Sequence, residues 1–450
     1  MTRTRRTHRF TPALIALSAV TSPAHAQDDA AAPLPHPLAA YAGAYEVDPQ
    51  RTIIVTFAPE DEKLLVLDFD ALHFSVARQR VNPDEFSTGD ESATGLRFNR
   101  DAAGAVRGLR WTIEGQVAEA RRLDTLRIEE VAWSHDDVEL AATVMIPEGA
   151  GRGPHPRAVA ADVPGAIIIQ GSGESARDNI WSQAFAAALA RAGIAVLLPD
   201  KRGSGKSSGD WRRCGFEDLA RDALTARDIL AACDGVDAKR IGMVGLSQGG
   251  GIAPLAAFVD PSIAFVIGVS CSVTTPAEQV MHEITQDVRR LEVPDEAVEQ
   301  VRELIRRKHA AVASIDAWPA YVELRTELIA AGLQQLDDAP FFPRSPGGPD
   351  WTFWRLIHDF DPLPLWTSIE TPCLILYGRE DEHDNVPVAR CEKLLADLRS
   401  QSPGRDLTCL VFEGAGHGLW DSGRAWGALR GDVIDALLAW LNGRAAGPAD

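Results

Sequence analysis

One short segment of the sequence has the residue types and spacing of a serine nucleophile. Gly245-Leu246-Ser247-Gln248-Gly249 lies between an apolar run that predicts a strand and a Gly- and Ala-rich run that predicts a helix. A Gly-x-Ser-x-Gly turn at such a junction is sharp enough to lift the serine hydroxyl out of the sheet. Gly245 and Gly249 are required there, because a Cβ at either position would strike the neighbouring strand or helix. We therefore expect Ser247 to attack an electrophilic carbon.

A serine hydroxyl is a weak nucleophile and needs a base that a third group orients. His417 is the candidate base, because it stands between glycines just past the last predicted strand. The acid is expected in the segment after the preceding strand, residues 379–387, which contains four acidic residues. Asp381, three residues after the glycine that ends the strand, is our first choice. Asp384 is the alternative, since it lies nearer to the Val-Pro step that follows.

The elements that must position these residues alternate between strand and helix over residues 125–445. The strands are continuous apolar runs, which are typical of a parallel sheet covered by helices on both faces. The alternation lapses at about residues 274–369, where helical periodicity and a Pro- and Trp-rich segment predict a helical cap inserted between two strands. The predicted fold class is α/β, with this domain preceded by a smaller one.

The smaller domain is expected at residues 37–124, where short β runs are broken by turn residues. This pattern predicts a small antiparallel β domain, either a lipocalin-like barrel or a sandwich. Residues 27–36 are Ala-, Asp- and Pro-rich and predict a flexible leader. Residues 1–26 combine a basic head, a short apolar stretch and Ala24-His25-Ala26, which is typical of a signal peptide cleaved after Ala26. We therefore expect a periplasmic or secreted protein.

Composition excludes several other classes of function. The 450-residue chain has a formal net charge of −19, which opposes binding to nucleic acid. No apolar run reaches the roughly 18 residues of a membrane span. The six cysteines do not form a dense disulfide framework, and no spacing predicts a zinc site. We expect no metal and no organic cofactor, while the disulfide pairing and the oligomeric state are not predicted.

As an ordered set, these motifs resemble the α/β-hydrolase superfamily, in particular its bacterial esterases and serine-peptidase-like hydrolases. The resemblance covers about residues 126–442 and also rests on Gln170–Gly173, Arg177-Asp178 and Asp200–Ser207. The opening of the N-terminal domain, Leu38–Tyr45, resembles the small lipocalin-like modules that are attached to some bacterial serine hydrolases.

The resemblance implies where a developing oxyanion is held. It assigns one backbone N–H donor to Gln248, directly after the nucleophile, and the other to Ser172, in the loop after the first central strand. Gly171 and Gly173 are expected to let this loop approach the substrate closely. Preorganised N–H donors of this kind stabilise the charge that develops during acyl transfer.

Two further groups of residues have two interpretations each. The Gly-rich segment 200–207 is interpreted as a structural loop that borders the site, and its charged neighbours either form supporting ion pairs or contact the substrate. These neighbours are Arg177, Asp178 and Arg202. The aromatic residues of the cap either line an apolar pocket or pack within the cap; they are Trp318, Trp351, Phe353, Trp354 and Trp366.

The implied reaction is acyl transfer from a small-molecule ester or amide to water. His417 would remove a proton as Ser247 attacks the carbonyl carbon, and would then protonate the leaving group. The first hypothesis is an exported carboxylesterase that cleaves small acyl esters. The second is a serine exopeptidase or amidase of the same fold, and the third is a non-catalytic binding protein.

Overall fold

The computed structural model describes residues 36–48, 51–58, 62–68, 73–79, 82–88, 95–113, 115–148, 162–333, 336, 342–420 and 429–445. The predicted signal peptide, residues 1–26, lies outside these residues, as does all but the last residue of the predicted leader.

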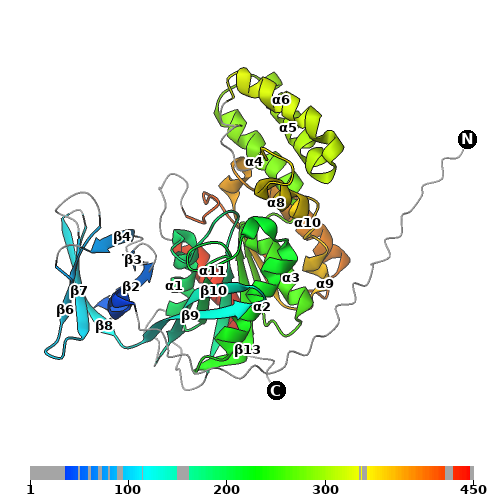
Figure 1. Ribbon diagram of the computed structural model, residues 1–450. Helices are drawn as coiled ribbons and strands as arrows, with labels where there is room; N and C mark the ends of the chain where they lie inside the picture. The colour runs from blue at the N-terminus through cyan, green and yellow to red at the C-terminus, as the bar shows by residue number, and fades with distance from the viewer. Residues whose placement is uncertain are drawn as a thin grey trace, which may run out of the picture. The chain divides into compact units, whose positions relative to one another are not determined.

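The N-terminal part of the described chain is a closed antiparallel barrel (Figure 1). A short 3₁₀ helix, η1 (Pro37–Tyr41), precedes eight strands: β1 (Gly43–Asp48), β2 (Arg51–Ala58), β3 (Lys63–Asp68), β4 (His73–Gln79), β5 (Glu85–Ser87), β6 (Gly95–Arg100), β7 (Val106–Ile113) and β8 (Gln116–Leu123). Strand β1 pairs with both β2 and β8, which closes the sheet on itself. Tyr45, Phe57 and Trp111 are fully buried in its core. Of the two predicted architectures, the barrel is the one that forms.

The second sheet has eight strands in the order β16-β15-β14-β13-β11-β12-β10-β9. Their bounds are β9 (Leu126–His135), β10 (Val138–Pro147), β11 (Val163–Ile169), β12 (Ala195–Pro199), β13 (Val236–Leu246), β14 (Val266–Val269), β15 (Cys373–Gly378) and β16 (Leu407–Phe412). The six strands from β11 onward run parallel, β10 pairs antiparallel with β12, and β9 pairs antiparallel with β10. After β12, the chain crosses to the other side of β11 to form β13. In open α/β sheets such a reversal creates a crevice at the carboxyl ends of the strands.

Helices cover both faces of this sheet, as the continuous apolar strands predict. On one face pack α1 (Ile180–Arg191) and α11 (Gly431–Ala445). On the other pack α2 (Phe216–Ala231), α3 (Gly249–Val259) and α10 (Val388–Gln401). The predicted fold class is confirmed: an α/β sheet with helices on both faces, preceded by a small antiparallel β domain.

The helical cap lies between β14 and β15 in the chain, and Figure 1 shows its helices in green to orange above the sheet. It consists of α4 (Pro276–Arg290), α5 (Asp295–Ala313), η3 (Ile315–Ala317), α6 (Trp318–Ala330), α8 (Pro349–Ile357) and α9 (Leu365–Ser368). Helix α4 begins with Pro276 in its first turn, and the Thr275 side chain accepts a hydrogen bond from the Glu278 N–H. This is an N-cap that satisfies a backbone donor at the start of the helix. Tyr321 and Leu304 are buried where the cap helices meet.

Two further observations concern the cysteines and the hydropathy of the helices. All six cysteines carry free thiols, four of them buried. Among the helices that the structure describes, not one combines the length and the apolar character needed to cross a bilayer.

Candidate active site

Ser247 occupies a strained turn between β13 and α3. Its backbone φ is +50°, in the left-handed region that residues with a side chain rarely adopt. The Ser247 N–H donates to the Val269 carbonyl at the end of β14, at 2.8 Å, and the Ser247 carbonyl accepts from the Gly250 N–H at 2.9 Å. These two bonds fix the turn between the sheet and the first turn of the helix.

The flanking glycines are required by the closeness of the surrounding backbone. A Cβ on Gly245 would lie 2.1 Å from the Gly249 carbonyl oxygen, and a Cβ on Gly249 would lie 2.2 Å from the Ile169 carbonyl oxygen. Both distances are far below van der Waals contact, so neither position accepts a side chain. The sharp turn predicted at Ser247 is therefore formed for the reason given from the sequence.

His417 and Asp381 are joined by a hydrogen bond. The His417 Nδ1 lies 2.8 Å from the Asp381 Oδ2, and Asp381 is completely buried. The other carboxylate oxygen, Oδ1, accepts from the Asn385 N–H at 3.1 Å. One face of the imidazole is packed against Trp181 of α1, with ring centroids 5.1 Å apart. The ring is thus oriented by a carboxylate and held by an indole.

The acid loop and the base loop come together because Gly378 has no side chain. A Cβ on Gly378 would lie 2.3 Å from the Ala415 carbonyl oxygen, so the end of β15 can press directly on the loop after β16. The Glu380 N–H also donates to the Ala415 carbonyl, at 2.9 Å. A short 3₁₀ helix, η4 (Arg379–His383), then turns Asp381 inward.

Charge around His417 favours its protonated form. Burial by itself lowers the pKa of the imidazole, but the Asp381 carboxylate, with smaller contributions from Glu283 and Asp384, leaves the pKa raised above its ordinary value. A raised pKa suits a base that must accept a proton from a hydroxyl group.

The alternative acid, Asp384, points elsewhere. Its side chain is 44% exposed, and its Oδ1 accepts from Arg290 of α4 at 2.6 Å. The structure therefore brings Asp381, and not Asp384, into contact with the candidate base.

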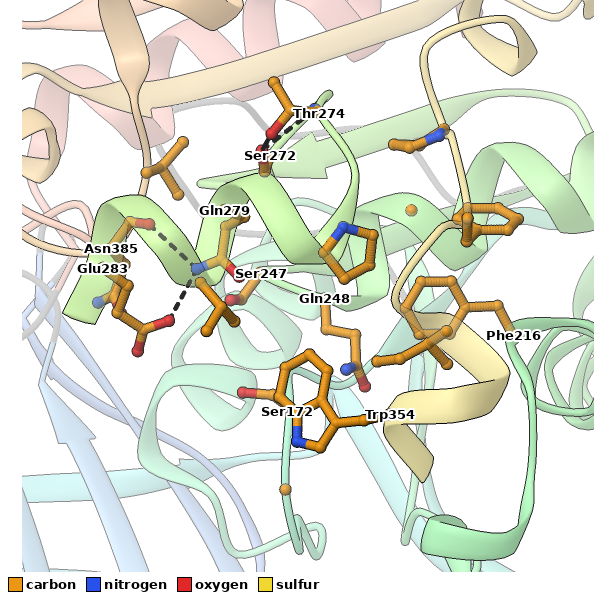
Figure 2. A pocket seen from close by; sticks show the side chains of 18 of the residues that line it. Ser172, Phe216, Ser247, Gln248, Ser272, Thr274, Gln279, Glu283, Trp354 and Asn385 are labelled. Atoms are coloured by element: carbon orange, nitrogen blue, oxygen red, sulfur yellow. Dashed lines mark hydrogen bonds between the residues drawn. The ribbon is translucent and has the colours of Figure 1, made fainter. Parts of the chain in front are cut away.

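Ser247 and His417 line one cavity of about 350 Å³ beneath the cap. One side is aromatic and apolar, formed by Trp211, Phe216, Phe353, Trp354, Ile357 and Phe360. The other side is polar, formed by Ser270, Ser272, Thr274, Gln279, Glu283 and Asn385. Figure 2 shows Ser172, Ser247 and Gln248 at the cavity, together with Gln279 and Glu283 of α4, which belong to its polar side. Of the cap aromatics, Phe353 and Trp354 line the cavity, whereas Trp366 is buried against Gly268 of β14.

Both predicted oxyanion donors border this cavity. Ser172 follows β11 and Gln248 is the N-cap of α3, so the crevice between the ends of β11 and β13 contains both residues. Within the described residues, neither the Ser172 N–H nor the Gln248 N–H donates to a protein acceptor. A Cβ on Gly171 would lie 3.4 Å from the Ser247 Cβ, which shows how closely this loop approaches the nucleophile. Two N–H groups are thus available to a bound ligand.

Charged and polar residues behind the loop hold it in place. The Gln170 Oε1 accepts hydrogen bonds from the Ser175 and Ser182 hydroxyls. Arg177 is completely buried and forms a hydrogen-bonded ion pair with Asp200, at 2.6 Å. Asp178 pairs with Lys63 and Arg202 pairs with Asp222. The three charged residues singled out from the sequence therefore all form ion pairs.

Comparison with known families identifies the domain that holds these residues. A family model described as "Alpha/beta hydrolase family" matches residues 167–429, which is more than half of the chain. The chain belongs to the alpha/beta hydrolase family. This match supports hydrolase activity, and the recognition made from the sequence motifs is confirmed at the level of the superfamily.

Several solved structures are similar to this alpha/beta hydrolase. An esterase of Pyrococcus furiosus is 14% identical, with a TM-score of 0.44, covering 70% of this chain and 91% of the esterase. The enzyme Est1E of Butyrivibrio proteoclasticus, solved with ferulic acid, is 18% identical, with a TM-score of 0.43, covering 70% and 99%. Proline iminopeptidase of Mycobacterium smegmatis is 17% identical, with a TM-score of 0.44, covering 71% and 100%. The comparison with curated protein sequences found no match.

Three residues at the site of this hydrolase were not singled out for a role from the sequence. Glu283 of α4 faces the cavity, and burial raises its pKa to about 7. Gln279, one turn earlier, donates to Glu283 at 2.9 Å and to the Asn385 carbonyl at 3.0 Å, as the dashed lines in Figure 2 show. Lys201 lies behind the oxyanion loop. The spacing of Gln279 and Glu283 on a helix was the available signal for the first two.

No cluster of three or more His, Cys, Asp or Glu side chains suited to a metal ion occurs within the described residues. The site consists of a hydroxyl, an imidazole, a carboxylate and backbone donors. Such a set is suited to nucleophilic acyl transfer.

Proposed function

We propose that this chain is a serine carboxylesterase, with Ser247 as nucleophile, His417 as general base and Asp381 as the acid that orients it. One observation carries the proposal: the Ser247 and His417 side chains line the same cavity, and the Asp381 Oδ2 lies 2.8 Å from the far nitrogen of His417. Nucleophile, base and orienting group thus occur in the order that acyl transfer requires.

The mechanism follows from these positions. His417 Nε2 takes the hydroxyl proton as the Ser247 Oγ attacks the ester carbonyl, and the carbonyl oxygen becomes an oxyanion. The N–H groups of Ser172 and Gln248 donate hydrogen bonds to this oxyanion, and Asp381 stabilises the imidazolium. The C–O bond to the leaving alcohol breaks as His417 returns the proton to it. Water, deprotonated by the same imidazole, then attacks the acyl group and releases the acid and free Ser247.

The cavity sets the size and polarity of the substrate. A volume of about 350 Å³ lies at the lower end of the range of small-molecule sites. The aromatic wall suits an aryl or short alkyl group, which supports small acyl esters over long-chain lipids.

The direct test uses a fluorophosphonate probe and an aryl ester. The wild-type protein is expected to be labelled on Ser247 and to hydrolyse p-nitrophenyl acetate or butyrate, while Ser247→Ala loses both properties. A Ser247→Ala protein that hydrolyses the ester at the wild-type rate would overturn the proposal. A folded wild-type protein that neither reacts with the probe nor hydrolyses any ester or amide would favour the non-catalytic alternative.

One observation favours aminoacyl amides as a second substrate class. Glu283 and Asp350 are acidic groups on the cavity wall, and an acidic group can bind the free amine of an aminoacyl substrate. Assaying aminoacyl-p-nitroanilides beside p-nitrophenyl esters on the same preparation discriminates the two classes. A kcat/KM for the anilides that exceeds that for the esters would reassign the protein as an aminopeptidase.

We also propose that the protein is exported, on the basis of residues 1–26. Expression of the full chain in a Gram-negative host, followed by mass spectrometry of the periplasmic protein, is expected to yield a chain that begins at Gln27. Recovery of the uncleaved chain from the cytoplasm alone would contradict this proposal.

A further inference from the structure

A buried lysine lies directly behind the oxyanion loop. Lys201 follows β12, and only 8% of its surface is exposed. Its Nζ donates to the carbonyl oxygens of Gly171 at 2.5 Å and of Gly173 at 3.0 Å, and lies 3.5 Å from the Gln248 Oε1. The two glycines flank Ser172 in the sequence, and the third partner is the side chain of Gln248. Lys201 therefore contacts the neighbours of one proposed oxyanion donor and the side chain of the other.

The bond to Gly171 decides the direction in which Ser172 donates. The Gly171 carbonyl and the Ser172 N–H belong to the same peptide group, and in a planar trans peptide these two groups point in opposite directions. A lysine that holds the carbonyl on the protein side therefore turns the N–H toward the cavity. A donor on the carbonyl also polarises the peptide and strengthens its N–H as a donor.

Without such a tie, this loop has little to fix it locally. Glycine on both sides of Ser172 leaves the adjoining peptide groups free to rotate, and Gly173 already has a φ of +76°. The loop needs glycine because it approaches Ser247 closely, and glycine makes its backbone flexible. A fixed conformation of residues 171–173 therefore depends on contacts with residues outside the loop.

The charge on Lys201 is also uncompensated. Within the described part of the chain, Lys201 forms no ion pair, whereas the nearby Arg177 and Arg202 each have a carboxylate partner. The Trp211 ring lies 5.5 Å from its Nζ. Burial lowers the pKa of Lys201 to about 7, which reflects the cost of keeping a cation without a counter-charge. A negative charge forms next to this position only when the substrate carbonyl becomes an oxyanion.

We propose that Lys201 is a positioning residue of the oxyanion site: it locks the 171–172 peptide so that the Ser172 N–H faces the cavity, and in its protonated form it also places a positive charge behind that peptide. The inference rests on the proposed acyl transfer at Ser247. Lys201 touches the loop and not the substrate, so its effect is felt in the transition state and little in substrate binding.

The test is Lys201→Met, with Lys206→Met as the matched control. Lys206 lies in the same loop and its replacement removes the same charge, but its side chain is 43% exposed and lies 3.3 Å from Glu130. With p-nitrophenyl butyrate, we expect Lys201→Met to lower kcat by about 10- to 100-fold, less than the loss of a whole oxyanion donor, with KM within about threefold. The control is expected to keep kcat within about twofold.

A transition-state mimic provides a readout that a purely structural role would not change. An alkyl trifluoromethyl ketone forms a tetrahedral adduct with the serine and places an oxyanion on the same donors. Its inhibition constant is expected to weaken in Lys201→Met by about the factor lost in kcat, while the inhibition constant of the product acid stays the same. If kcat and the ketone affinity both stay within twofold of wild type, the inference is wrong.

A second variant covers a failure to fold. Lys201→Gln is neutral and shorter but retains an N–H donor, and a fall in kcat of at least about fivefold at constant KM is expected. An unchanged kcat in that variant overturns the inference. Failure of the proposed function looks different, because it would be seen in the wild-type protein as the absence of fluorophosphonate label on Ser247.

Discussion

Replacing Asp381 by asparagine tests the orientation of the base most directly. The carboxylate has two separate tasks: its Oδ2 holds the His417 Nδ1 at 2.8 Å, and its Oδ1 accepts from the Asn385 N–H at 3.1 Å. An asparagine has the same shape but only one oxygen acceptor. One of the two donors must therefore face an NH₂ group.

The expected loss of activity depends on which of the two donors, the His417 Nδ1–H or the Asn385 N–H, loses its acceptor. If the amide oxygen stays on His417, the NH₂ group opposes the Asn385 N–H in a fully buried place, which costs about 1–3 kcal/mol. The flipped amide avoids this cost but donates to Nδ1, which leaves the proton on Nε2. That tautomer cannot accept the proton of Ser247. We expect kcat to fall by about 10³- to 10⁴-fold, equivalent to about 4–5.5 kcal/mol of barrier.

The assay is steady-state hydrolysis of p-nitrophenyl butyrate by Asp381→Asn and Asp384→Asn, with circular dichroism to show that both are folded. Asp384 is 44% exposed and pairs with Arg290, so its replacement should leave kcat within about twofold. An Asp381→Asn protein that keeps kcat within tenfold of wild type would refute the reasoning. A larger loss in Asp384→Asn than in Asp381→Asn would move the acid to residue 384.

Three further predictions follow from neighbouring contacts. Glu283→Gln removes a carboxylate that raises the pKa of His417 once pH exceeds about 7, so the acidic limb of the kcat/KM profile should move to lower pH. A shift to higher pH would contradict this sign. Gly245→Ala places a methyl group 2.1 Å from a carbonyl oxygen and should abolish fluorophosphonate labelling or folding, whereas a fully active variant would be incompatible with the turn described. Asp200→Asn removes the buried carboxylate 2.6 Å from Arg177 and leaves only Glu130, at 3.3 Å, as a counter-charge, so the free energy of unfolding in urea should fall by about 3–5 kcal/mol. A loss below about 1 kcal/mol would speak against the Arg177–Asp200 ion pair.

The parts of the site that depend on local chain geometry could be predicted from the sequence. The turn at Ser247 needs glycine on both sides whatever surrounds it, so the pattern Gly-x-Ser-x-Gly was sufficient. His417 could be predicted for a similar reason, because a loop histidine after the last strand of a parallel sheet lies at the edge where the nucleophile also lies. The alternation of apolar strands with helices in turn predicted the doubly wound sheet.

The remaining parts depend on contacts between distant segments. The choice between Asp381 and Asp384 required the 3₁₀ turn of η4 and the closeness of Gly378 to Ala415, neither of which has a local pattern. Lys201 lies in a Gly-rich segment that was interpreted as structural, and its role became visible only when the strand order placed β12 next to β11. For the cap, helical periodicity predicted helices but could not specify which of their faces would line the cavity.

The insertion between β14 and β15 separates the residues of the candidate active site into two groups. Ser247, Ser172, Asp381 and His417 all come from segments outside the insertion, whereas Gln279, Glu283, Phe353 and Trp354 come from within it. Under the proposed function, the groups that break the bond therefore come from outside the insertion, while part of the cavity wall comes from within it. Variation at Phe353 and Trp354 would change the cavity wall and leave the proposed catalytic residues in place, so these two positions are where a search for altered selectivity should begin.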